Sequence, residues 1–461
     1  MTDLSAIIKA YDVRGTVPDQ LNEDVARAVG IAFARVLAEQ GTGATAVVVA
    51  HDMRESGPGL VAAYAEGLRS VGLDVVNVGL CSTDELYYAS GILDLPGAMF
   101  TASHNPAQYN GIKHCYAGAK PVGQESGLAR IKEIAQDLLD SGAATEVGGL
   151  RGGYEERDML PAYAEHLRGL VDLSGIRPLK VVVDAGNGMG GFTVPAVLGD
   201  AVLPALPLDI VPMYFELDGS FPNHEANPLE PKNIVDLQAA VVKNGADLGL
   251  AFDGDADRCF VVDADGDPVS PSAITALVAT RELAKHPGGT VIHNLITSRA
   301  VPEIVTENGG VPVRTRVGHS FIKAEMAKTD AIFGGEHSAH YYFRDFWGAD
   351  TGMLAAMHVL AALGEQDKPL KELAARFERY AASGEINSTV TDQRAKLDEV
   401  KQAFADSEQD ELDGLTVSFA DGAWINLRPS NTEPLLRLNI EAPSAERVAQ
   451  LRDDVLAIVR G

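Results

Sequence analysis

Three aspartates stand at alternate positions of one short segment and could together bind a divalent cation. Asp253, Asp255 and Asp257 lie in FDGDADR, directly after the apolar run LGLAF. In an extended chain, residues at i, i+2 and i+4 point to the same side, so we expect the three carboxylates to converge. They would repel one another unless a hard cation lay among them, and oxygen ligands alone favour Mg²⁺ over zinc. The segment therefore predicts a magnesium site, with a solvated acidic turn as the alternative.

The same region does not match a calcium-binding EF-hand. The glycine required at the turn of that loop would be Arg258, and the glutamate at its twelfth position would be Ala264. A second acidic run, DADGD at 263–267, has the composition of a hairpin turn. We expect this second run to be solvated and to bind nothing.

A serine that could act as a nucleophile occurs in TASHNPAQYNGIKHCY, residues 101–116. Ser103 is flanked by small and turn-forming residues after a predicted strand, so we expect its hydroxyl on an exposed loop. Serine is a weak nucleophile unless a base, a metal or a dry pocket activates it. His104 could transfer a proton and Lys113 could compensate charge. The alternative is that Ser103 is only a turn residue.

Two further polar segments are suited to binding a phosphate and a sugar. RPSNTEP at 428–434 offers a guanidinium, hydroxyls and an amide in a turn bounded by prolines, which suits a phosphate dianion; a plain β-turn is the alternative. GEHSAH at 335–340 places Glu336, Ser338 and His340 at alternate positions, and alternation would turn them to one face, where a carboxylate and a hydroxyl can bind sugar hydroxyls.

A glycine-rich segment, DAGNGMGG at 184–191, formally matches the dinucleotide fingerprint through Gly186, Gly188 and Gly191. The acidic residue expected about 20 positions later would be Asp209, which lies at the start of the next β-rich run, whereas a ribose requires it at the end. We favour a tight structural turn. An NAD-dependent oxidoreductase is the alternative that rests on these glycines.

The elements that must position these residues alternate in an α/β pattern. Strands are predicted at 45–52, 73–80, 178–186 and 246–267 (two strands around the acidic loop), and helices at 57–72, 83–94 and 127–142. The helix at 83–94 leads to the segment 97–106, and a third cycle from about residue 268 includes 290–296, 311–323 and 330–343. The segments TGMLAAMHVLAAL and LKELAARFERY are predicted to be helical, and 415–442 alternates differently before a terminal amphipathic helix. GAATEVGGLRGGYEERD at 142–158 is rich in glycine and charge and predicts a linker. Three α/β units of similar length followed by a smaller fourth unit account for this order.

Composition and charge restrict the partners and the compartment. The chain has 461 residues, 46% of them hydrophobic, and a formal charge of −27 from 38 Lys and Arg against 65 Asp and Glu. This charge repels nucleic acid and anionic membranes, so we expect neither as a partner. No apolar run reaches the roughly 18 residues of a membrane helix, and no secretory signal is visible. Three cysteines without metal-ligand spacing suit a reducing compartment, so we expect a cytoplasmic protein.

Taken together, the motifs resemble those of the α-D-phosphohexomutase superfamily, and most closely its bacterial phosphomannomutase/phosphoglucomutase branch. TASHNP, DGDADR, GEHSAH and RPSNTEP occur in the order of that family, at domain-sized spacing, and the similarity covers essentially the whole chain. The resemblance implies four domains around a central cleft, three related α/β units with mixed sheets and a smaller C-terminal α+β domain. The expected ranges are 1–150 with the phosphoserine loop, 151–258 ending in the metal loop, 259–375 with the sugar loop, and 376–461 with the phosphate-binding loop.

The resemblance also implies a role for each matching residue. Ser103 would carry the phosphoryl group, and one of its oxygens would complete the Mg²⁺ shell of Asp253, Asp255 and Asp257. Arg258 would contact the moving phosphate, Lys113 would neutralise charge or move a proton, and His104 and His340 are proton-transfer candidates. The expected substrate-binding residues are Tyr11, Arg14, Gly318, His319, Glu336, Ser338, Arg428, Ser430, Asn431 and Thr432.

The reaction implied is the interconversion of mannose 1-phosphate and mannose 6-phosphate, and of the corresponding glucose phosphates, through a hexose 1,6-bisphosphate. The expected partner is the hexose phosphate, and the expected state is a monomer or weak homodimer. LDGSFPNHEANPLEP at 217–231 is similar to phosphomannomutases, and His337 stands where the phosphoglucosamine branch carries glutamine; Ala339 stands where glycine is usual. A phosphoglucosamine mutase is the nearest alternative. A phosphosugar sensor is another, but it would need neither Ser103 nor the acidic loop.

Overall fold

The computed structural model describes residues 3–9, 11–143, 149, 151–430 and 435–461. The chain divides into two compact units. The first comprises Met1–Val269 and Ser338–Lys371, and the second comprises Ser270–His337 and Glu372–Gly461. Within the described residues the strands form four sheets, which confirms the predicted α/β class.

The N-terminal sheet of the first unit is mixed. Its strand order is β1 (Val13–Thr16), β5 (Tyr109–Tyr116), β4 (Gly97–Phe100), β2 (Ala46–His51), β3 (Asp74–Leu80) and β7 (Tyr154–Glu156), with β6 (Lys120–Pro121) on β5. Strands β4, β2, β3 and β7 are parallel, and β5 pairs antiparallel with β4 and β1. Strand β7 lies inside the segment that the sequence analysis assigned wholly to a linker; pairing with β3 orders it.

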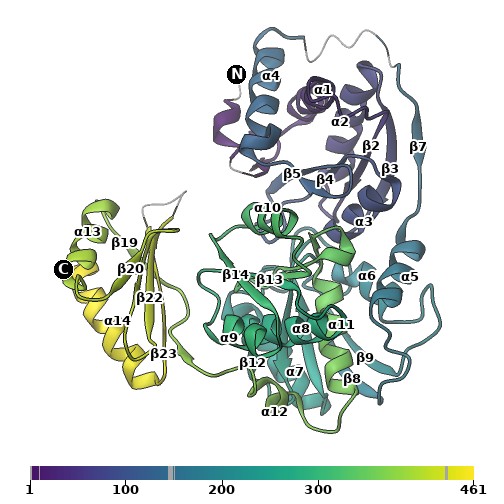
Figure 1. Ribbon diagram of the computed structural model, residues 1–461. Helices are drawn as coiled ribbons and strands as arrows, with labels where there is room; N and C mark the ends of the chain where they lie inside the picture. The colour runs from purple at the N-terminus through teal and green to yellow at the C-terminus, as the bar shows by residue number, and fades with distance from the viewer. Residues whose placement is uncertain (1–2, 10, 144–148, 150, 431–434) are drawn as a thin grey trace. The chain divides into compact units, whose positions relative to one another are not determined.

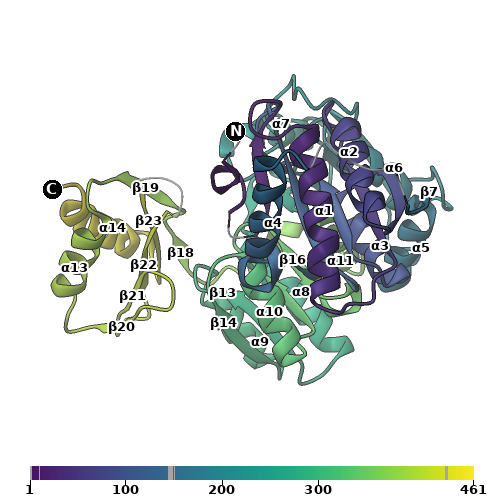
Figure 2. The same ribbon diagram turned by 90° about the horizontal axis from the view of Figure 1, so that it is seen from above.

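Helices cover this sheet on both sides. They are α1 (Glu23–Glu39), α2 (Gly57–Ser70), α3 (Thr83–Leu93) and α4 (Ala129–Asp140). Figure 2 shows α4, α1 and α2 side by side. Helices α1 and α2 approach closely because each has a glycine at the crossing: a Cβ on Gly30 would lie 2.4 Å from the Tyr64 carbonyl oxygen, and one on Gly67 would lie 2.3 Å from that of Arg27. Close packing of these helices fixes the sheet from which the serine loop projects.

The second sheet of this unit carries the acidic loop. Its order is β12 (Pro268–Val269), β11 (Cys259–Asp263), β10 (Leu248–Phe252), β8 (Leu179–Asp184) and β9 (Leu208–Met213), accompanied by α5 (Leu160–Leu170), α6 (Gly190–Val197) and α7 (Val235–Asn244). Strands β10 and β11 form an antiparallel hairpin in which Phe252 pairs with Cys259. All five residues of β10 are buried, as expected for a strand covered on both faces. The remainder of the unit is β16 (Tyr341–Phe343), β17 (Ala349–Asp350) and α11 (Gly352–Gly364).

The second unit contains three parallel strands and, farther along the chain, an antiparallel sheet (Figure 1). The parallel strands are β14 (Val311–Thr315), β13 (Thr290–Asn294) and β15 (Phe333–Gly335) in that order, with α8 (Pro271–Lys285), α9 (Ala300–Glu307) and α10 (His319–Thr329). The antiparallel sheet has β18 (Ala381–Ala382), β23 (Leu435–Ala442), β22 (Trp424–Pro429), β21 (Leu415–Ser418) and β20 (Glu408–Asp410), with β19 (Ile386–Thr389) on β23 and with α13 (Gln393–Ala403) and α14 (Ala445–Arg460).

Helix α12 (Leu370–Ala374) is shorter than the helix predicted up to residue 380. Among the described residues, no helix combines the length and the apolar character needed to cross a membrane.

Candidate functional site

The three aspartates of the acidic loop converge where β10 turns back into β11. Asp253, Asp255 and Asp257 are at most 1% exposed, and each offers a carboxylate oxygen within 4.8 Å of the others. The loop is a turn, with Ala256 at φ +60°, so the predicted extended geometry is wrong while the predicted convergence is confirmed. A turn folds the three side chains inward, whereas a straight strand would have spaced them along one face.

Some carboxylate oxygens of this cluster have hydrogen-bond partners and others have none among the described residues. Asp255 Oδ1 and Asp257 Oδ1 are buried and have no hydrogen-bond partner in the part of the chain that the structure describes, although a buried polar atom is rarely left unpaired. Burial raises the pKa of Asp253 to about 7 against the opposing charge of Arg258. Burial also acts to raise the pKa of Asp255, but Lys113 outweighs it and lowers that pKa well below its ordinary value. The proximity of these carboxylates and their unpaired oxygens suits a hard cation.

Ser103 lies directly against this cluster. Its Oγ donates to Asp253 Oδ2 at 2.8 Å, and its backbone N–H donates to Thr101 Oγ1 at 2.9 Å. Ser103 is only 5% exposed, so the predicted exposed loop is wrong: the acidic loop covers it. Its φ of +49° is in the left-handed region, which non-glycine residues seldom occupy outside functional sites.

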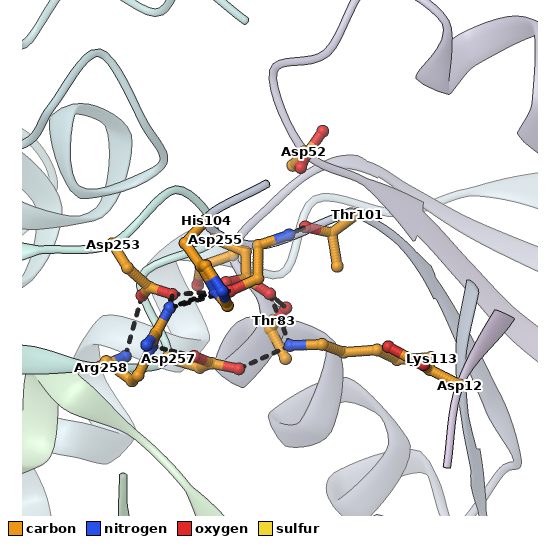
Figure 3. Close-up of polar contacts among 12 residues, drawn as sticks. Asp12, Asp52, Thr83, Thr101, His104, Lys113, Asp253, Asp255, Asp257 and Arg258 are labelled. Carbon is orange, nitrogen blue, oxygen red and sulfur yellow. Dashed lines mark hydrogen bonds and ion pairs between the residues drawn. The ribbon is translucent and has the colours of Figure 1, made fainter. Parts of the chain in front are cut away.

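Two cations neutralise most of the carboxylate charge (Figure 3). Lys113 Nζ on β5 bridges Asp255 Oδ2 at 2.7 Å and Asp257 Oδ2 at 2.6 Å. Burial would lower the pKa of Lys113, but these two carboxylates raise it well above its ordinary value, so the ammonium stays charged. Arg258 Nε donates to Asp253 Oδ2 at 2.9 Å. When all three carboxylates are ionised they exceed the two cations by one negative charge, whereas the raised pKa of Asp253 lets that carboxyl hold a proton when no further cation is bound.

The predicted histidines flank the cluster in different states. Arg258 Nη2 lies 2.6 Å from His104 Nδ1 and 3.3 Å from Ser103 Oγ. Burial and the Arg258 charge lower the pKa of His104 well below its ordinary value, so its imidazole is neutral. His340 Nδ1 lies 3.0 Å from Asp350 Oδ2. Burial lowers the pKa of His340, but Asp257 and Asp350 outweigh this effect and raise it overall.

The N-terminal residues reach the serine loop from β1. Arg14 Nη1 donates to Asn105 Oδ1 at 2.7 Å, and Nη2 contacts Asp12 Oδ2 at 2.7 Å. Tyr11 is 43% exposed, which leaves its ring accessible to a ligand.

The glycine-rich segment is a structural turn, as predicted. A Cβ on Gly188 would lie 2.6 Å from the Gly254 carbonyl oxygen, and the Met189 N–H donates to that same oxygen at 2.9 Å. A Cβ on Gly254 would in turn lie 2.3 Å from the Ser103 carbonyl oxygen. The glycines therefore allow the backbones of this turn, the acidic loop and the serine loop to stack in contact.

The second acidic run, DADGD, is also a turn, between β11 and β12. The Asp265 and Asp267 N–H groups donate to Asp263 Oδ1 at 2.9 and 3.0 Å, and Lys371 Nζ lies 2.8 Å from Asp265 Oδ2. These contacts confirm the prediction of a hairpin turn, and they show that Lys371 pairs with its exposed carboxylates.

The predicted sugar loop is a turn as well, so the alternation argument for Glu336, Ser338 and His340 is wrong. Residues His337 and Ser338 are in the turn, and Ala339 has φ +63°, the left-handed region in which glycine is at ease. Glu336 belongs to the second unit, whereas Ser338 and His340 belong to the first.

Within the second unit, Glu336 is 2% exposed and accepts from Asn294 Nδ2 at 3.0 Å. Gly318, at φ +129°, directly precedes α10, whose first residue is His319.

The predicted phosphate-binding segment begins at the end of β22. Arg428 lies on this strand, with Nη2 3.9 Å from Glu385 Oε2 and Nη1 4.0 Å from Asp413 Oδ2. The Ser430 N–H donates to the Leu435 carbonyl at 2.8 Å. Asn431 and Thr432 lie outside the described residues.

Several site residues were missed by sequence reasoning. Thr83, at the start of α3, donates its hydroxyl to Asp255 Oδ2 at 2.6 Å and its N–H to the Asp255 carbonyl at 3.1 Å. Asp350 Oδ2 lies 3.0 Å from His340 Nδ1, and Arg54 Nη2 donates to the Ser103 carbonyl oxygen at 2.9 Å. Thr83 and Arg54 lie far along the chain from their partners, whereas Asp350 is ten residues from His340. The local signal for Thr83 was the Ser82–Thr83 pair at a predicted helix start.

Comparison with protein families places matching domains along the chain. Residues 5–140, 161–266 and 270–380 match the phosphoglucomutase/phosphomannomutase alpha/beta/alpha domains I, II and III, and residues 385–458 match the C-terminal domain of that family. The order of these matches is that of the sheets in the structure.

Relatives and solved structures agree with this match. The chain is 41% identical to phosphohexose mutases of Xanthomonas campestris pv. campestris, over 98% of this chain and 99% of that one, and 40% identical to a phosphomannomutase of Salmonella typhimurium, over 96% of both. A phosphoglucomutase/phosphomannomutase family protein from Burkholderia thailandensis superposes with a TM-score of 0.86 at 34% identity, covering 100% of this chain and 98% of that one. An Aspergillus fumigatus N-acetylphosphoglucosamine mutase, at 15% identity and TM-score 0.63, covering 98% and 96%, shares the fold. The chain belongs to the phosphoglucomutase/phosphomannomutase family.

Proposed function

We propose that the protein is a phosphomannomutase that interconverts mannose 1-phosphate and mannose 6-phosphate, and also the two glucose phosphates, through phosphorylated Ser103 and a hexose 1,6-bisphosphate. The observation that carries this proposal is the 2.8 Å contact between Ser103 Oγ and Asp253 Oδ2 at the edge of a buried carboxylate cluster. The names of the Xanthomonas and Salmonella relatives support the reaction class and the choice of mannose.

We further propose that Asp253, Asp255 and Asp257 hold Mg²⁺ together with an oxygen of phosphorylated Ser103. The unpaired Asp255 Oδ1 and Asp257 Oδ1 and the excess negative charge support a hard cation at this place. The Aspergillus fumigatus mutase was crystallised with GlcNAc-6P and magnesium. When bound, the ion would offset carboxylate charge and stabilise the oxygens of the transferring phosphoryl group.

The chain's own groups then have distinct tasks in the transfer. A sugar hydroxyl oxygen forms a bond to phosphorus as the bond from phosphorus to Ser103 Oγ breaks; the sugar hydroxyl loses a proton and the leaving Ser103 Oγ gains one, so the proton count balances. Arg258, 3.3 Å from Ser103 Oγ, would stabilise the moving charge. Lys113 stays protonated, so we assign it charge compensation. His104 is neutral and accepts from Arg258, so we assign proton transfer to His340.

Substrate recognition would use groups that serve both orientations of the bisphosphate. We propose that Glu336 and Ser338 bind the 3- and 4-hydroxyls, because these look alike when the sugar turns end over end. Gly318 and His319 would lie near the reactive end of the sugar. We propose that Arg428, Ser430, Asn431 and Thr432 hold the non-transferring phosphate, and that Tyr11 and Arg14 line the substrate-binding cleft.

We also propose domain boundaries near residues 150, 258 and 375, a monomer or weak homodimer, and a cytoplasmic location. Cys81, Cys115 and Cys259 are buried, and none of the three forms a disulfide within the described residues, which supports a reducing compartment.

The direct test is phosphorylation of Ser103. After incubation with a hexose 1,6-bisphosphate, intact mass spectrometry should show one added HPO₃ on the wild type and on Ser70→Ala, a control serine on α2. Ser103→Ala should gain none and should lose mutase activity while keeping its circular dichroism spectrum. A wild-type protein that never accepts phosphate contradicts the proposal. A coupled assay with mannose 1-phosphate, glucose 1-phosphate and glucosamine phosphate tests the sugar, and preference for the last would assign the phosphoglucosamine reaction instead.

A further inference from the structure

One buried arginine, Arg54, donates hydrogen bonds to the backbone of the loop that carries Ser103. The Arg54 side chain is 1% exposed and uses all of its N–H groups. Nη1 donates to the carbonyl oxygens of Pro106 and Tyr109 at 3.0 and 2.9 Å. Nη2 donates to those of Ser103 and Asn105 at 2.9 and 2.7 Å. Four carbonyls of a seven-residue loop therefore converge on one guanidinium.

The arginine is itself fixed on its other side. Its Nε lies 3.2 Å from Asp52 Oδ2, and its backbone N–H donates to Asp52 Oδ1 at 2.9 Å. Asp52 is fully buried and also accepts from the Thr101 hydroxyl. The ring of Phe221 lies 5.2 Å from the guanidinium carbon, which shields this side from water. The guanidinium has little freedom to move.

These contacts bear directly on the orientation of Ser103. Its N–H is held by Thr101 Oγ1 and its carbonyl by Arg54 Nη2, one on each side of the residue. Between these two anchors the residue adopts φ +49°, a conformation that serine does not favour by itself. With both peptide groups fixed, the side chain is directed at Asp253, where Oγ lies 2.8 Å from the carboxylate.

We infer that Arg54 is a positioning residue for phosphoryl transfer: it holds the Ser103 backbone in the conformation that aligns Oγ with the acidic loop. This inference rests on the proposed function. Arg54 donates to carbonyl groups and to Asp52, and its N–H groups are all engaged, so it acts through Ser103 and not through contact with the sugar. Loss of its contacts would displace the nucleophile without removing any group from the substrate-binding residues.

A lysine at position 54 could not make the same set of hydrogen bonds. Arginine offers five N–H donors in a rigid fork, whereas lysine offers three donors from one nitrogen, so Arg54→Lys keeps the charge but cannot span four carbonyls. A displacement of about 1 Å at reacting atoms can cost on the order of 100-fold in rate. We therefore expect Arg54→Lys to lower the rate of transfer from phosphorylated Ser103 by about that factor, with little change in the KM for the hexose phosphate.

The experiment measures transfer per phosphorylated molecule. Wild type, Arg54→Lys and the matched control Arg130→Lys, a half-exposed arginine paired with Glu39 on the surface, are loaded with hexose 1,6-bisphosphate. Intact mass gives the phosphorylated fraction, and rapid quench with a hexose monophosphate gives the single-turnover rate of that fraction. A purely structural role would reduce the fraction but leave its rate at the wild-type value, and that result overturns the inference.

A second variant keeps the test decisive if Arg54→Lys does not fold. Thr101→Val removes the acceptor for the Ser103 N–H while preserving side-chain shape, so its phosphorylated fraction should also transfer more slowly than wild type. An unchanged rate would show that the backbone anchors of Ser103 do not set its reactivity. If wild-type Ser103 itself never becomes phosphorylated, the proposed function fails first, and this is seen in the loading step before any variant is compared.

Discussion

Replacing Thr83 with valine tests whether this first residue of α3 orients the Asp255 carboxylate for binding a cation. The Thr83 hydroxyl donates to Asp255 Oδ2 at 2.6 Å, and Lys113 shares that oxygen, so Oδ1 remains unpaired. Thr83 is fully buried and valine has nearly the same shape, so the change removes a hydrogen bond without opening a cavity. A hydrogen bond to a charged group contributes about 1.5–3 kcal/mol.

Without this donor the Asp255 carboxylate is free to rotate, and Lys113 can take both oxygens. About 2 kcal/mol corresponds to roughly a 30-fold change in a binding constant, within the 10–100-fold range typical of groups that orient metal ligands. We expect Thr83→Val to weaken Mg²⁺ binding by about that factor, as measured by isothermal titration calorimetry on the full chain.

Thr83→Ser is the matched control, because it keeps the hydroxyl and loses only a methyl group. It should bind Mg²⁺ nearly as well as wild type, even though removing the methyl costs about 1 kcal/mol of stability. Equal affinities for Thr83→Val and Thr83→Ser would refute the reasoning, since they would show that the hydroxyl does not orient Asp255.

Four other substitutions have defined outcomes. Glu336→Ala should reduce turnover and the discrimination between mannose and glucose phosphates, whereas Arg428→Ala should mainly raise KM; equal, small effects in steady-state kinetics would contradict both roles. Gly254→Ala would place a Cβ 2.3 Å from the Ser103 carbonyl oxygen and displace the serine loop. Because a displacement of about 1 Å at reacting atoms can cost on the order of 100-fold in rate, we expect a loss of activity of at least about tenfold; wild-type activity would contradict the close approach. Burial lowers the pKa of His224, but the Asp184 carboxylate at 3.0 Å outweighs this and raises it above its ordinary value. This pair therefore adds stability that is present below the unfolded-state pKa of about 6.5 and is lost as the pH rises through the folded-state pKa. Titration of the His224 ring by NMR should show a raised pKa that falls in Asp184→Asn, and no difference between the two proteins would contradict the pairing.

The order of elements was largely predictable, because hydrophobic periodicity is a local property of the chain. The predicted strand at 45–52 is β2 (Ala46–His51), and the helix at 57–72 is α2 (Gly57–Ser70). The exceptions depend on distant partners. Strand β7 forms inside the predicted linker only because β3 offers it an edge, and nothing within 142–158 encodes that edge.

The candidate site, like the fold, was predictable from the sequence only in part. The sequence alone pointed to the side chains that we propose to carry the chemistry: the aspartates of the acidic loop, Ser103 and Lys113 were all candidates from residue type and spacing. The sequence also indicated that the glycine-rich segment is a turn. These features are visible because each motif is short and continuous.

Only the tertiary structure decided how these groups act together. The chain had to fold before Ser103 could be seen buried against Asp253, 150 positions away, or Thr83 found on Asp255. The left-handed backbone at Ser103 and Ala256 likewise follows from contacts that the local sequence does not contain. The physical reason is that type and spacing are written along the chain, whereas burial, charge balance and orientation arise when separate strands and helices bring distant groups within hydrogen-bond distance.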